Sequence, residues 1–433
     1  MGFQQGLSGL NAASKNLDVI SNNIANVSTV GFKSSRTEFS DVYATATFGA
    51  NNLQAGLGAQ TVSVAQQFTQ GGLSVSSNPL DVAISGNGFF RLSGEAGNTY
   101  TRSGQFRMDK DGFLVTNTGE NVTGYTTLTL DNFKVVGTSN LGNIKIDLDG
   151  INADATTELA LNVNLNSSAV PPGSLTPPVA FDATVPASYN YSTSVSVYDS
   201  LGTEHTVRYF FVKEDPVATP NTWTAYAYLD NTAPGLIGGT PPGDQIDLNG
   251  AVAGGGHTMT FSNTGNLTGG LTATNALDPI VISGAENLVI NMDFTGSSQY
   301  FGGSGVNSVS QNGFQSGSLV GLGIGDDGVI SGRYSNGVNQ PLQQLVLVTF
   351  RNPQSMVPVG QSQWVATLDA GAETINKPGE GVAGLVQSNS VEDSNTDLTG
   401  ELVNLIIAQR LYQANAQSIT AQSTILQTLV NLR

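Results

Sequence analysis

The sequence predicts a mainly β protein whose chain begins and ends in an α-helix. Apolar residues recur every three or four positions over residues 1–28 and 398–433, which is the period of a helix. Between these ends the period falls to two, and turns rich in Gly, Asn and Asp recur. The 52 glycines in 433 residues exceed the usual share of about 7% and favour many hairpins. We therefore expect N- and C-terminal coiled-coil-like helices together with nested β-domains.

The first helix is expected over residues 1–28. Its apolar positions form one stripe, and every second member of the stripe lies seven residues from the next, the spacing of a coiled-coil seam. The stripe consists of Phe3, Leu7, Leu10, Ala13, Leu17, Ile20, Ile24 and Val27.

The last helix is expected over residues 398–433 and carries two stripes. One contains residues seven apart, which we expect to pack on the N-terminal stripe: Leu405, Tyr412, Ile419 and Leu426. The other lies on a different face and is assigned to contacts with neighbouring copies of the chain: Ile407, Leu411, Ile425 and Leu432.

Both expected helices carry few charges. Residues 1–28 contain only Lys15 and Asp18, although a solvated helix normally carries pairs of opposite charge. Two interpretations stay open: an ordinary two-helix cap on a globular core, or helices enclosed on several sides by copies of themselves. The second makes these residues assembly contacts: Leu7, Leu10, Leu17, Ile20, Ile24, Leu402, Leu405, Leu411, Tyr412, Ile419, Ile425 and Leu426.

The chain leaves the first helix through a segment rich in asparagine. Asn22, Asn23 and Asn26 are weak helix formers that tolerate turns. Gly31 is free to adopt a positive φ, and Phe32 follows it as an apolar anchor. The segment therefore predicts a helix exit that is encoded locally.

Composition excludes several classes of function. The 16 basic and 33 acidic residues give a net charge of −17, which argues against nucleic acid and anionic membranes because both bind clustered Lys and Arg. The absence of cysteine excludes disulfides and thiol catalysis. No stretch reaches the roughly 20 apolar residues of a membrane span, so we expect no membrane insertion. No apolar run precedes Lys15, so we expect no cleaved secretory signal peptide.

The β body divides by composition. Residues 148–299 contain 14 acidic and two basic residues, so −12 of the net charge of −17 lies there. We expect them to form an outer β-domain inserted into a first β-domain, which comprises 79–147 and 300–370. Residues 29–78 and 371–397 are expected to be linker regions.

Motifs that suggest chemistry are interpreted as turns. Residues 323–328 match G-x-G-x-x-G, but strand-like sequence follows, and two aspartates within the motif repel phosphate. Residues 109–112 lack the remaining ligands of a calcium loop. The chain has two histidines, His205 in an apparent strand and His257 in a glycine-rich loop, and no cysteine. These residues supply too few ligands for a metal site and too few groups for a nucleophilic triad. We expect no active site, no metal and no cofactor.

Several segments resemble one protein family. The stretch NNIANVSTVGFK is similar to the N-terminal signature of bacterial flagellar axial proteins, the rod and hook group, and residues 394–433 resemble the closing helix of that family. Residues 80–92 and 100–125 resemble its first β-domain, while 197–211 and 332–337 resemble hook members specifically. The residues on the signature are Ala25, Asn26, Thr29, Gly31, Phe32 and Lys33.

The resemblance implies a structural subunit of the flagellar hook and not an enzyme. It implies self-assembly into a hollow helical polymer, a flexible joint that transmits torque from rod to filament. It also implies an extracellular location in the flagellum, after type III export without a cleaved signal peptide. The implied partners are other copies, the distal rod protein, the hook cap protein, the hook–filament junction protein and the flagellar export apparatus. A distal rod subunit and a secreted β-rich adhesin stay open as alternatives.

One position departs from the family pattern. An acidic residue usually stands where this chain has Gly400, three residues after the expected N-cap Asp397, and completes a capping box. Glycine inside a helix costs up to about 1 kcal/mol relative to alanine. We therefore expect the first turn of the last helix to fray, or the helix to start later.

Overall fold

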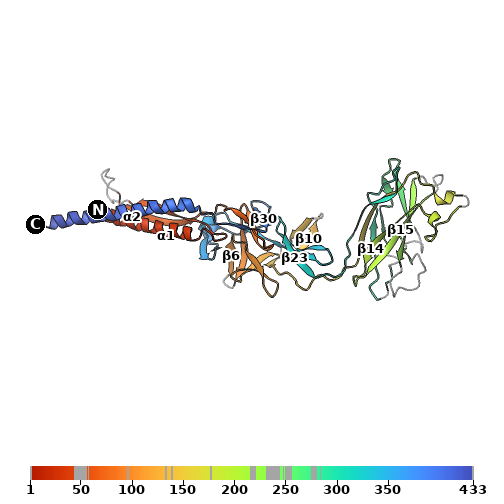
Figure 1. Cartoon of the computed structure of the whole chain (residues 1–433), viewed down its shortest axis with the longest axis horizontal. Coiled ribbons are helices and arrows are strands. Elements are labelled where there is room, and N and C mark those ends of the chain that lie inside the picture. Colours follow the sequence, from red (N-terminus) through yellow and green to blue (C-terminus); the bar gives the residue numbers. More distant parts are fainter. Residues whose placement is uncertain are drawn as a thin grey trace. The chain divides into compact units, whose positions relative to one another are not determined.

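The computed structural model describes residues 2–42, 56, 58–94, 97–131, 134–137, 140–175, 178–214, 221–230, 244–246, 248, 256–274, 280–282 and 284–431. They form two compact units (Figure 1). Unit 1 comprises Met1–Leu148, Val320–Arg333 and Asn339–Arg433, and unit 2 comprises Asp149–Leu319 and Tyr334–Val338.

Two α-helices lie within the described ranges, one at each end of the chain. Helix α1 spans Gly2–Ala25 and helix α2 spans Leu398–Asn431. They lie side by side in unit 1 (Figure 1), and the remaining described elements are strands and short 3₁₀ turns. The expected fold class, mainly β with helical termini, is confirmed.

Helices α1 and α2 are antiparallel and approach closely because α1 carries small residues on the shared side. A Cβ atom added to Gly6 would lie 2.9 Å from Cγ1 of Ile419, and one added to Gly9 would lie 2.9 Å from the Asn415 side-chain amide. On the α2 side, Ala408 is buried. These small residues let the two helix backbones approach closely, and the larger apolar side chains of α2 lie on its other faces.

The segment after α1 is more structured than the expected linker. Strands β1 (Ser35–Val42) and β2 (Gly58–Gln66) form an antiparallel hairpin that contacts α1. Beyond it, the half-buried Phe68 packs edge-to-face against Phe89 and Trp364 of the β body, with ring centroids 5.4 Å away in both cases. An aromatic ring held in a core prevents this segment from acting as a free linker.

The segment before α2 is also built into the sheets of unit 1, where the sequence suggested a second linker. Strand β3 (Leu73–Val75) pairs with β31 (Ser390–Glu392), and β4 (Val82–Ser85) pairs with β30 (Leu385–Ser388). Backbone hydrogen bonds thereby tie the two connecting segments to each other and to the β body.

In the described part of unit 1, the largest sheet has 13 strands. Its main path runs β23-β24-β25-β9-β5-β6-β28-β27, with β7, β8, β12, β26 and β29 attached at its sides. A separate antiparallel pair is formed by β10 (Leu128–Asp131) and β11 (Lys134–Gly137). The members of the large sheet are β5 (Phe89–Gly94), β6 (Gly97–Thr101), β7 (Phe106–Met108), β8 (Leu114–Thr116), β9 (Asn121–Tyr125), β12 (Leu141–Asn143), β23 (Leu319–Ile324), β24 (Val329–Tyr334), β25 (Asn339–Leu345), β26 (Leu347–Thr349), β27 (Val357–Gly360), β28 (Gln363–Val365) and β29 (Thr374–Asn376).

Unit 2 consists of two sheets around one apolar core. Among its described strands, six form the order β14-β15-β16-β18-β19 with β17 beside β16, and four form the order β20-β21-β13-β22. Trp223, Tyr209 and Phe294 are fully buried in the shared core. The strands are β13 (Glu158–Asn164), β14 (Tyr191–Tyr198), β15 (Glu204–Lys213), β16 (Thr222–Asp230), β17 (Asp244–Ile246), β18 (His257–Phe261), β19 (Leu267–Gly269), β20 (Thr272–Thr274), β21 (Asn291–Asp293) and β22 (Gly305–Gln311).

The boundary of unit 2 differs from the one that composition suggested. Strand β22 pairs with β13 in an antiparallel ladder, so residues 300–319 belong to unit 2 and not to the first β-domain. Charge density marked the end of the acidic segment at 299, but the backbone pairing continues past it into uncharged sequence.

The short motifs adopt turns. Residues 325–328 join β23 to β24, and residues 109–112 lie in the turn between β7 and β8, with Gly112 at a φ of 82°. His205 lies in β15 as expected, whereas His257 begins β18 and does not lie in a loop. The described residues contain no cluster of potential metal ligands, and none of their helices is long and apolar enough to span a membrane.

Candidate assembly site

Helix α1 ends in a series of tight turns built by asparagine side chains. The backbone N–H of Asn26 donates to the Asn22 carbonyl at 3.1 Å, and its side-chain amide donates to the same carbonyl at 2.9 Å. The Thr29 hydroxyl then donates to Oδ1 of Asn26 at 3.2 Å. These bonds satisfy carbonyls that the end of a helix leaves free. The expected local exit is present.

Gly31 fits a position that excludes any other residue. Its φ is +70°, a left-handed conformation that costs other residues free energy. A Cβ atom added there would lie 2.5 Å from the backbone nitrogen of Ser103. The N–H of Gly31 donates to the Glu392 carbonyl at 2.7 Å. The signature glycine therefore lets the helix exit contact the β body directly.

Two residues later the signature lysine enters the protein interior. The side chains of Lys33 and Glu392 are fully buried, and Nζ lies 2.6 Å from Oε1 of the carboxylate. Nζ also donates to the Thr69 carbonyl at 2.8 Å. The other oxygen of Glu392 accepts from Arg102 at 3.2 Å. Three segments that are far apart in sequence thus meet at one carboxylate.

This cluster has two cations for one anion. Burial lowers the pKa of Lys33 and of Arg102 below their ordinary values, although Glu392 opposes both shifts. Nε of Arg102 has no hydrogen-bond acceptor among the described residues, and the guanidinium carbon lies 5.3 Å from the centre of the Phe89 ring. Buried charges are stable only with well-formed partners, so the cluster depends on all three segments being in place.

Asparagine amides join the same segments on the helix side. The buried Asn23 donates to the Ser35 carbonyl at 2.8 Å and to the Glu401 carboxylate at 3.1 Å, and it accepts from the Ser35 N–H. Asn395 accepts from the Ser34 N–H at 2.8 Å and donates to the Gln67 carbonyl at 2.7 Å. The start of α2 is therefore tied to the exit of α1.

Helix α2 begins at Leu398, so the expectation of a later start is wrong. Oδ1 of Asp397 accepts from the Thr399 N–H at 3.0 Å, and the Asp397 carbonyl accepts from the Glu401 N–H at 2.9 Å. The N-cap works without an acidic residue at Gly400. Its neighbour Glu401 anchors the first turn through Asn23 instead.

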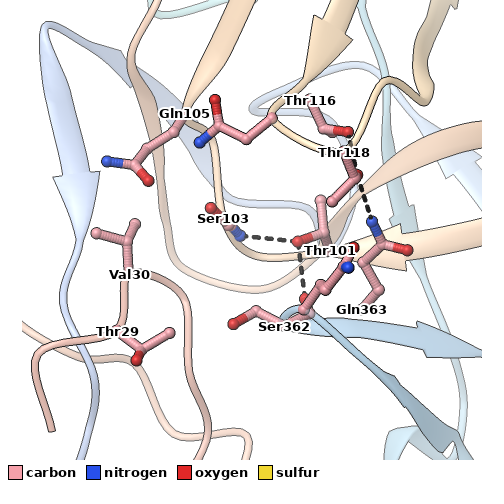
Figure 2. Close-up of a pocket in the computed structure, with 11 residues that line it drawn as sticks. Thr29, Val30, Thr101, Ser103, Gln105, Thr116, Thr118, Ser362 and Gln363 are labelled. Carbon is pink, nitrogen blue, oxygen red and sulfur yellow. Dashed lines mark hydrogen bonds between the residues drawn. The ribbon is translucent and has the colours of Figure 1, made fainter. Parts of the chain in front are cut away.

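A polar cavity of about 200 Å³ lies beside the helix exit (Figure 2). Thr29 and Val30 face Thr101 and Ser103 across it, and Val30 is its only apolar lining side chain among the described residues. The Thr101 hydroxyl donates to the Ser362 carbonyl at 2.8 Å. The lining offers hydrogen bonds but no charge. The lining residues are Thr29, Val30, Thr101, Ser103, Gln105, Thr116, Asn117, Thr118, Gln361, Ser362 and Gln363.

The signature residues play unequal parts in this arrangement. Gly31 and Lys33 are buried, Asn26 and Phe32 are half-buried, and Ala25 and Thr29 are exposed. Sequence reasoning did not find Glu392 and Arg102, which complete the buried cluster. The available signal was an isolated charge within or next to a strand, Glu392 in β31 and Arg102 directly after β6, in a chain of which only 11% is charged.

The residues assigned to assembly fall into two groups in the single chain. Ile20 is buried and Leu10, Leu17, Ile24, Leu405 and Ile419 are half-buried. The remaining residues are exposed: Leu7, Leu402, Leu411, Tyr412, Ile425 and Leu426.

Leu426 does not pack on the N-terminal stripe as expected, because it is 59% exposed. Gly6 faces Ile419, only a few residues from the start of α1, so the helix has no residue left to meet Leu426. Sequence spacing placed Leu426 on the correct face but carried no information about where the partner helix ends. Leu432 lies outside the described residues.

Four sequence-family models match the chain. Their descriptions and matched residues are "Flagella basal body rod protein" (3–33), "Flagellar hook protein FlgE/F/G D1 domain" (83–153), "Flagellar basal body protein FlaE D2 domain" (164–314) and "Flagellar basal body rod FlgEFG protein C-terminal" (387–432). The first and last of these contain both halves of the buried Lys33–Glu392 pair.

Flagellar hook proteins match the chain over its full length. The chain is 39% identical to the flagellar hook protein FlgE of Escherichia coli and 38% identical to that of Salmonella typhimurium, and each match covers 100% of both chains. The hook protein of Borreliella burgdorferi is 30% identical, with 99% of this chain and 98% of the relative covered. The chain belongs to the flagellar hook protein family.

The fold agrees with this family. The crystal structure of Helicobacter pylori flagellar hook protein FlgE2 matches with a TM-score of 0.51 at 16% identity, over 74% of this chain and 100% of the other. The chain is a structural subunit of the flagellar hook. The full-length matches to hook proteins also favour the hook over the rod and adhesin alternatives.

Proposed function

We propose that this hook subunit assembles into a hollow tube through its terminal helices, with the β-units outside them. The observation that carries this is the register of α1 and α2. Gly6 faces Ile419 and Gly9 faces Asn415, so each residue toward the start of α1 meets one further along α2. By this progression, residues of α2 beyond about 423 have no counterpart on the described α1, Gly2–Ala25, of the same chain.

The part of α2 beyond about residue 423, called the overhang below, carries apolar side chains that are exposed to water in a single chain. Ile425 and Leu426 are 61% and 59% exposed, and Leu411, on the same face as Ile425, is 53% exposed. Arg410 is the sole charged side chain in α2 after Glu401, so burying these faces against other copies costs little charge desolvation. Other copies of α1 and α2 carry the same apolar and nearly uncharged faces, so they are the expected partners of the overhang.

The buried charge cluster suits a subunit that transmits torque from rod to filament. Lys33, Glu392 and Arg102 link the exit of α1, the approach to α2 and the β body of unit 1. A joint of this kind makes the helical layer and the β body of unit 1 turn together. Bending then occurs at weaker, polar contacts between neighbouring copies.

We further propose that the subunit leaves the cell through the flagellar export apparatus with its N-terminus uncut. Gly6 faces Ile419 and Gly9 faces Asn415, so these residues are part of the helix pair and are retained in the assembled subunit. The ends of the tube meet the distal rod protein, the hook cap protein and the hook–filament junction protein. The role of the subunit is mechanical and not enzymatic.

Electron microscopy of the purified chain tests the proposal. The full chain is expected to form tubes in negative stain as its concentration rises. A chain that ends at Ser423 keeps the contacts of Gly6 and Gly9 with α2 but loses the overhang, and it is expected to stay monomeric. Tubes from the shortened chain, or monomers from the full chain at every concentration and salt condition, would contradict the proposed role of the overhang.

A further inference from the structure

Unit 2 is strongly acidic but contains long uncharged segments, one of which follows Asp293. Its two chain segments hold 14 acidic and two basic residues, a net charge of −12. No charged residue occurs between Asp293 and Asp326. Copies of an acidic domain repel one another wherever their charged faces meet, so close approach is easiest through a neutral face.

Much of this uncharged segment lies on the surface. In β22, the five residues from Val306 to Ser310 are all exposed, so neither face of the strand is covered by the rest of the described chain. The strand is the last of its sheet, with β13 on one side and no described strand on the other. Just before it, Phe301 is 84% exposed, the largest value of any aromatic side chain in the described residues.

An edge strand of this kind is normally protected. Proteins place Lys, Pro or inward-pointing charges on exposed edges, because free N–H and C=O groups pair readily with another chain. Strand β22 has neither Pro nor charge, and its one protective feature is a bulge opposite Asn162 and Val163. Strand β14, which also ends a sheet, differs because Val195 and Val197 point into the core.

We propose that β22 and the preceding Phe301 form a contact surface for unit 2 of a neighbouring copy. This rests on the proposed assembly of the chain into a tube. Val306, Val309 and Phe301 supply apolar contact, and the serine and asparagine side chains between them supply hydrogen bonds without charge. The occupant is a second copy because a polymer holds identical acidic units next to one another, and β22 itself carries no charge to repel the same strand of a neighbour.

Single cysteines test the surface cleanly because the chain has none of its own. Val309→Cys places a thiol on β22, and Ala187→Cys places one at another exposed position of unit 2, in a 3₁₀ turn. Both are expected to react with a maleimide at similar rates in the monomer. In the polymer, Cys at 309 is expected to react at least about tenfold more slowly, since packed interface cores exclude probes, while Cys at 187 keeps its rate.

A charge variant gives a second measurement. Val309→Glu is expected to lower the dissociation temperature of the polymer relative to Ala187→Glu, with the same monomer melting transition in both. Tubes in which Cys at 309 labels as fast as in the monomer, or in which both Glu variants dissociate alike, would overturn the contact surface and leave the tube intact. Absence of tubes from the unsubstituted chain would overturn the proposed function and this inference with it.

Discussion

Lys33 and Glu392 are separated by 359 positions in the sequence, yet Nζ and Oε1 lie 2.6 Å apart with both side chains fully buried. The pair closes the chain on itself at the point where both helices join the β body. Arg102, directly after β6, shares the same carboxylate and brings the large sheet of unit 1 to the joint. Consequently, the two terminal segments and the β body hold one another in place.

Replacing the buried lysine tests this joint. Lys33→Met is expected to reduce the free energy of unfolding of unit 1, but by less than the about 3–5 kcal/mol of leaving a buried charge unpaired, because Arg102 still pairs with Glu392. Lys15→Met is the matched control, because the side chain of Lys15 is 68% exposed beside Asp18 and such pairs contribute little. Urea unfolding of the two variants gives the comparison. Equal midpoints would show that the buried pair does not stabilise unit 1.

The helix exit is tested at its glycine. Gly31→Ala is expected to destabilise unit 1 by more than the roughly 1–2 kcal/mol of a left-handed alanine, because the new methyl group meets the Ser103 backbone. Gly119→Ala is the control, since Gly119 has a φ of 91° but nothing within 4 Å of the added Cβ. Thermal melting measures the loss of stability in both variants. Similar losses would show that the Ser103 backbone adds nothing to the cost of a left-handed alanine.

The terminal helices are expected to be poorly ordered in the isolated monomer. Their exposed apolar faces lack partners in a single chain, and helix ends with few contacts open readily. Amide hydrogen exchange of monomer and polymer provides the measurement. Residues 2–25 are expected to exchange fast in the monomer and slowly in the polymer. Strong protection of these residues in the monomer would favour the ordinary two-helix cap.

The outward face of α2 is expected to control assembly without affecting the β body. Leu411→Ala combined with Ile425→Ala removes two side chains that are 53% and 61% exposed in the single chain. Loss of a buried Leu or Ile costs about 2–5 kcal/mol, and in a polymer the loss recurs in every subunit. Sedimentation is expected to show no polymer, while calorimetry shows the β-body transition unchanged.

The exposed Gln413 and Gln427 lie on the same helix and provide a control for this double variant. Gln413→Ala with Gln427→Ala is expected to assemble normally. Normal tubes from the Leu411 and Ile425 variant would exclude this face as an intersubunit surface. Loss of the β-body transition would show that α2 belongs to the globular core.

Acid is expected to weaken unit 2 through Asp199. Burial raises the pKa of this carboxyl, but hydrogen bonds from His205 and from the N–H groups of Thr203 and Leu201 outweigh burial and hold the pKa below its ordinary value of 3.8. The unfolded chain therefore binds a proton more readily than the folded one. The stability that Asp199 contributes is present above about pH 5 and is lost as pH falls through the folded pKa. In Asp199→Asn, the free energy of unfolding of unit 2 is expected to fall less steeply as pH decreases. An equally steep fall in the variant and in the unsubstituted chain would contradict this role.

Features that depend only on neighbouring residues could be predicted from the sequence. The three-and-four spacing of apolar residues predicted α1 and α2, since helical periodicity is a property of residues a few positions apart. Asn26 and Gly31 predicted the helix exit because turn conformations are set by one or two residues. Resemblance in the terminal and central segments also identified the family before any contact was known.

Contacts between distant segments could be seen only in the folded chain. Spacing did not indicate that Glu392 would receive both Lys33 and Arg102, or that α1 would end before reaching Leu426. It also did not indicate that β22 would pair with β13 beyond the acidic segment. The physical reason is the same in each case. Contacts between residues hundreds of positions apart depend on the packing of the whole chain. A buried charge needs an oppositely charged partner, and a strand needs a neighbouring strand. Neither requirement produces a periodic pattern in the local sequence.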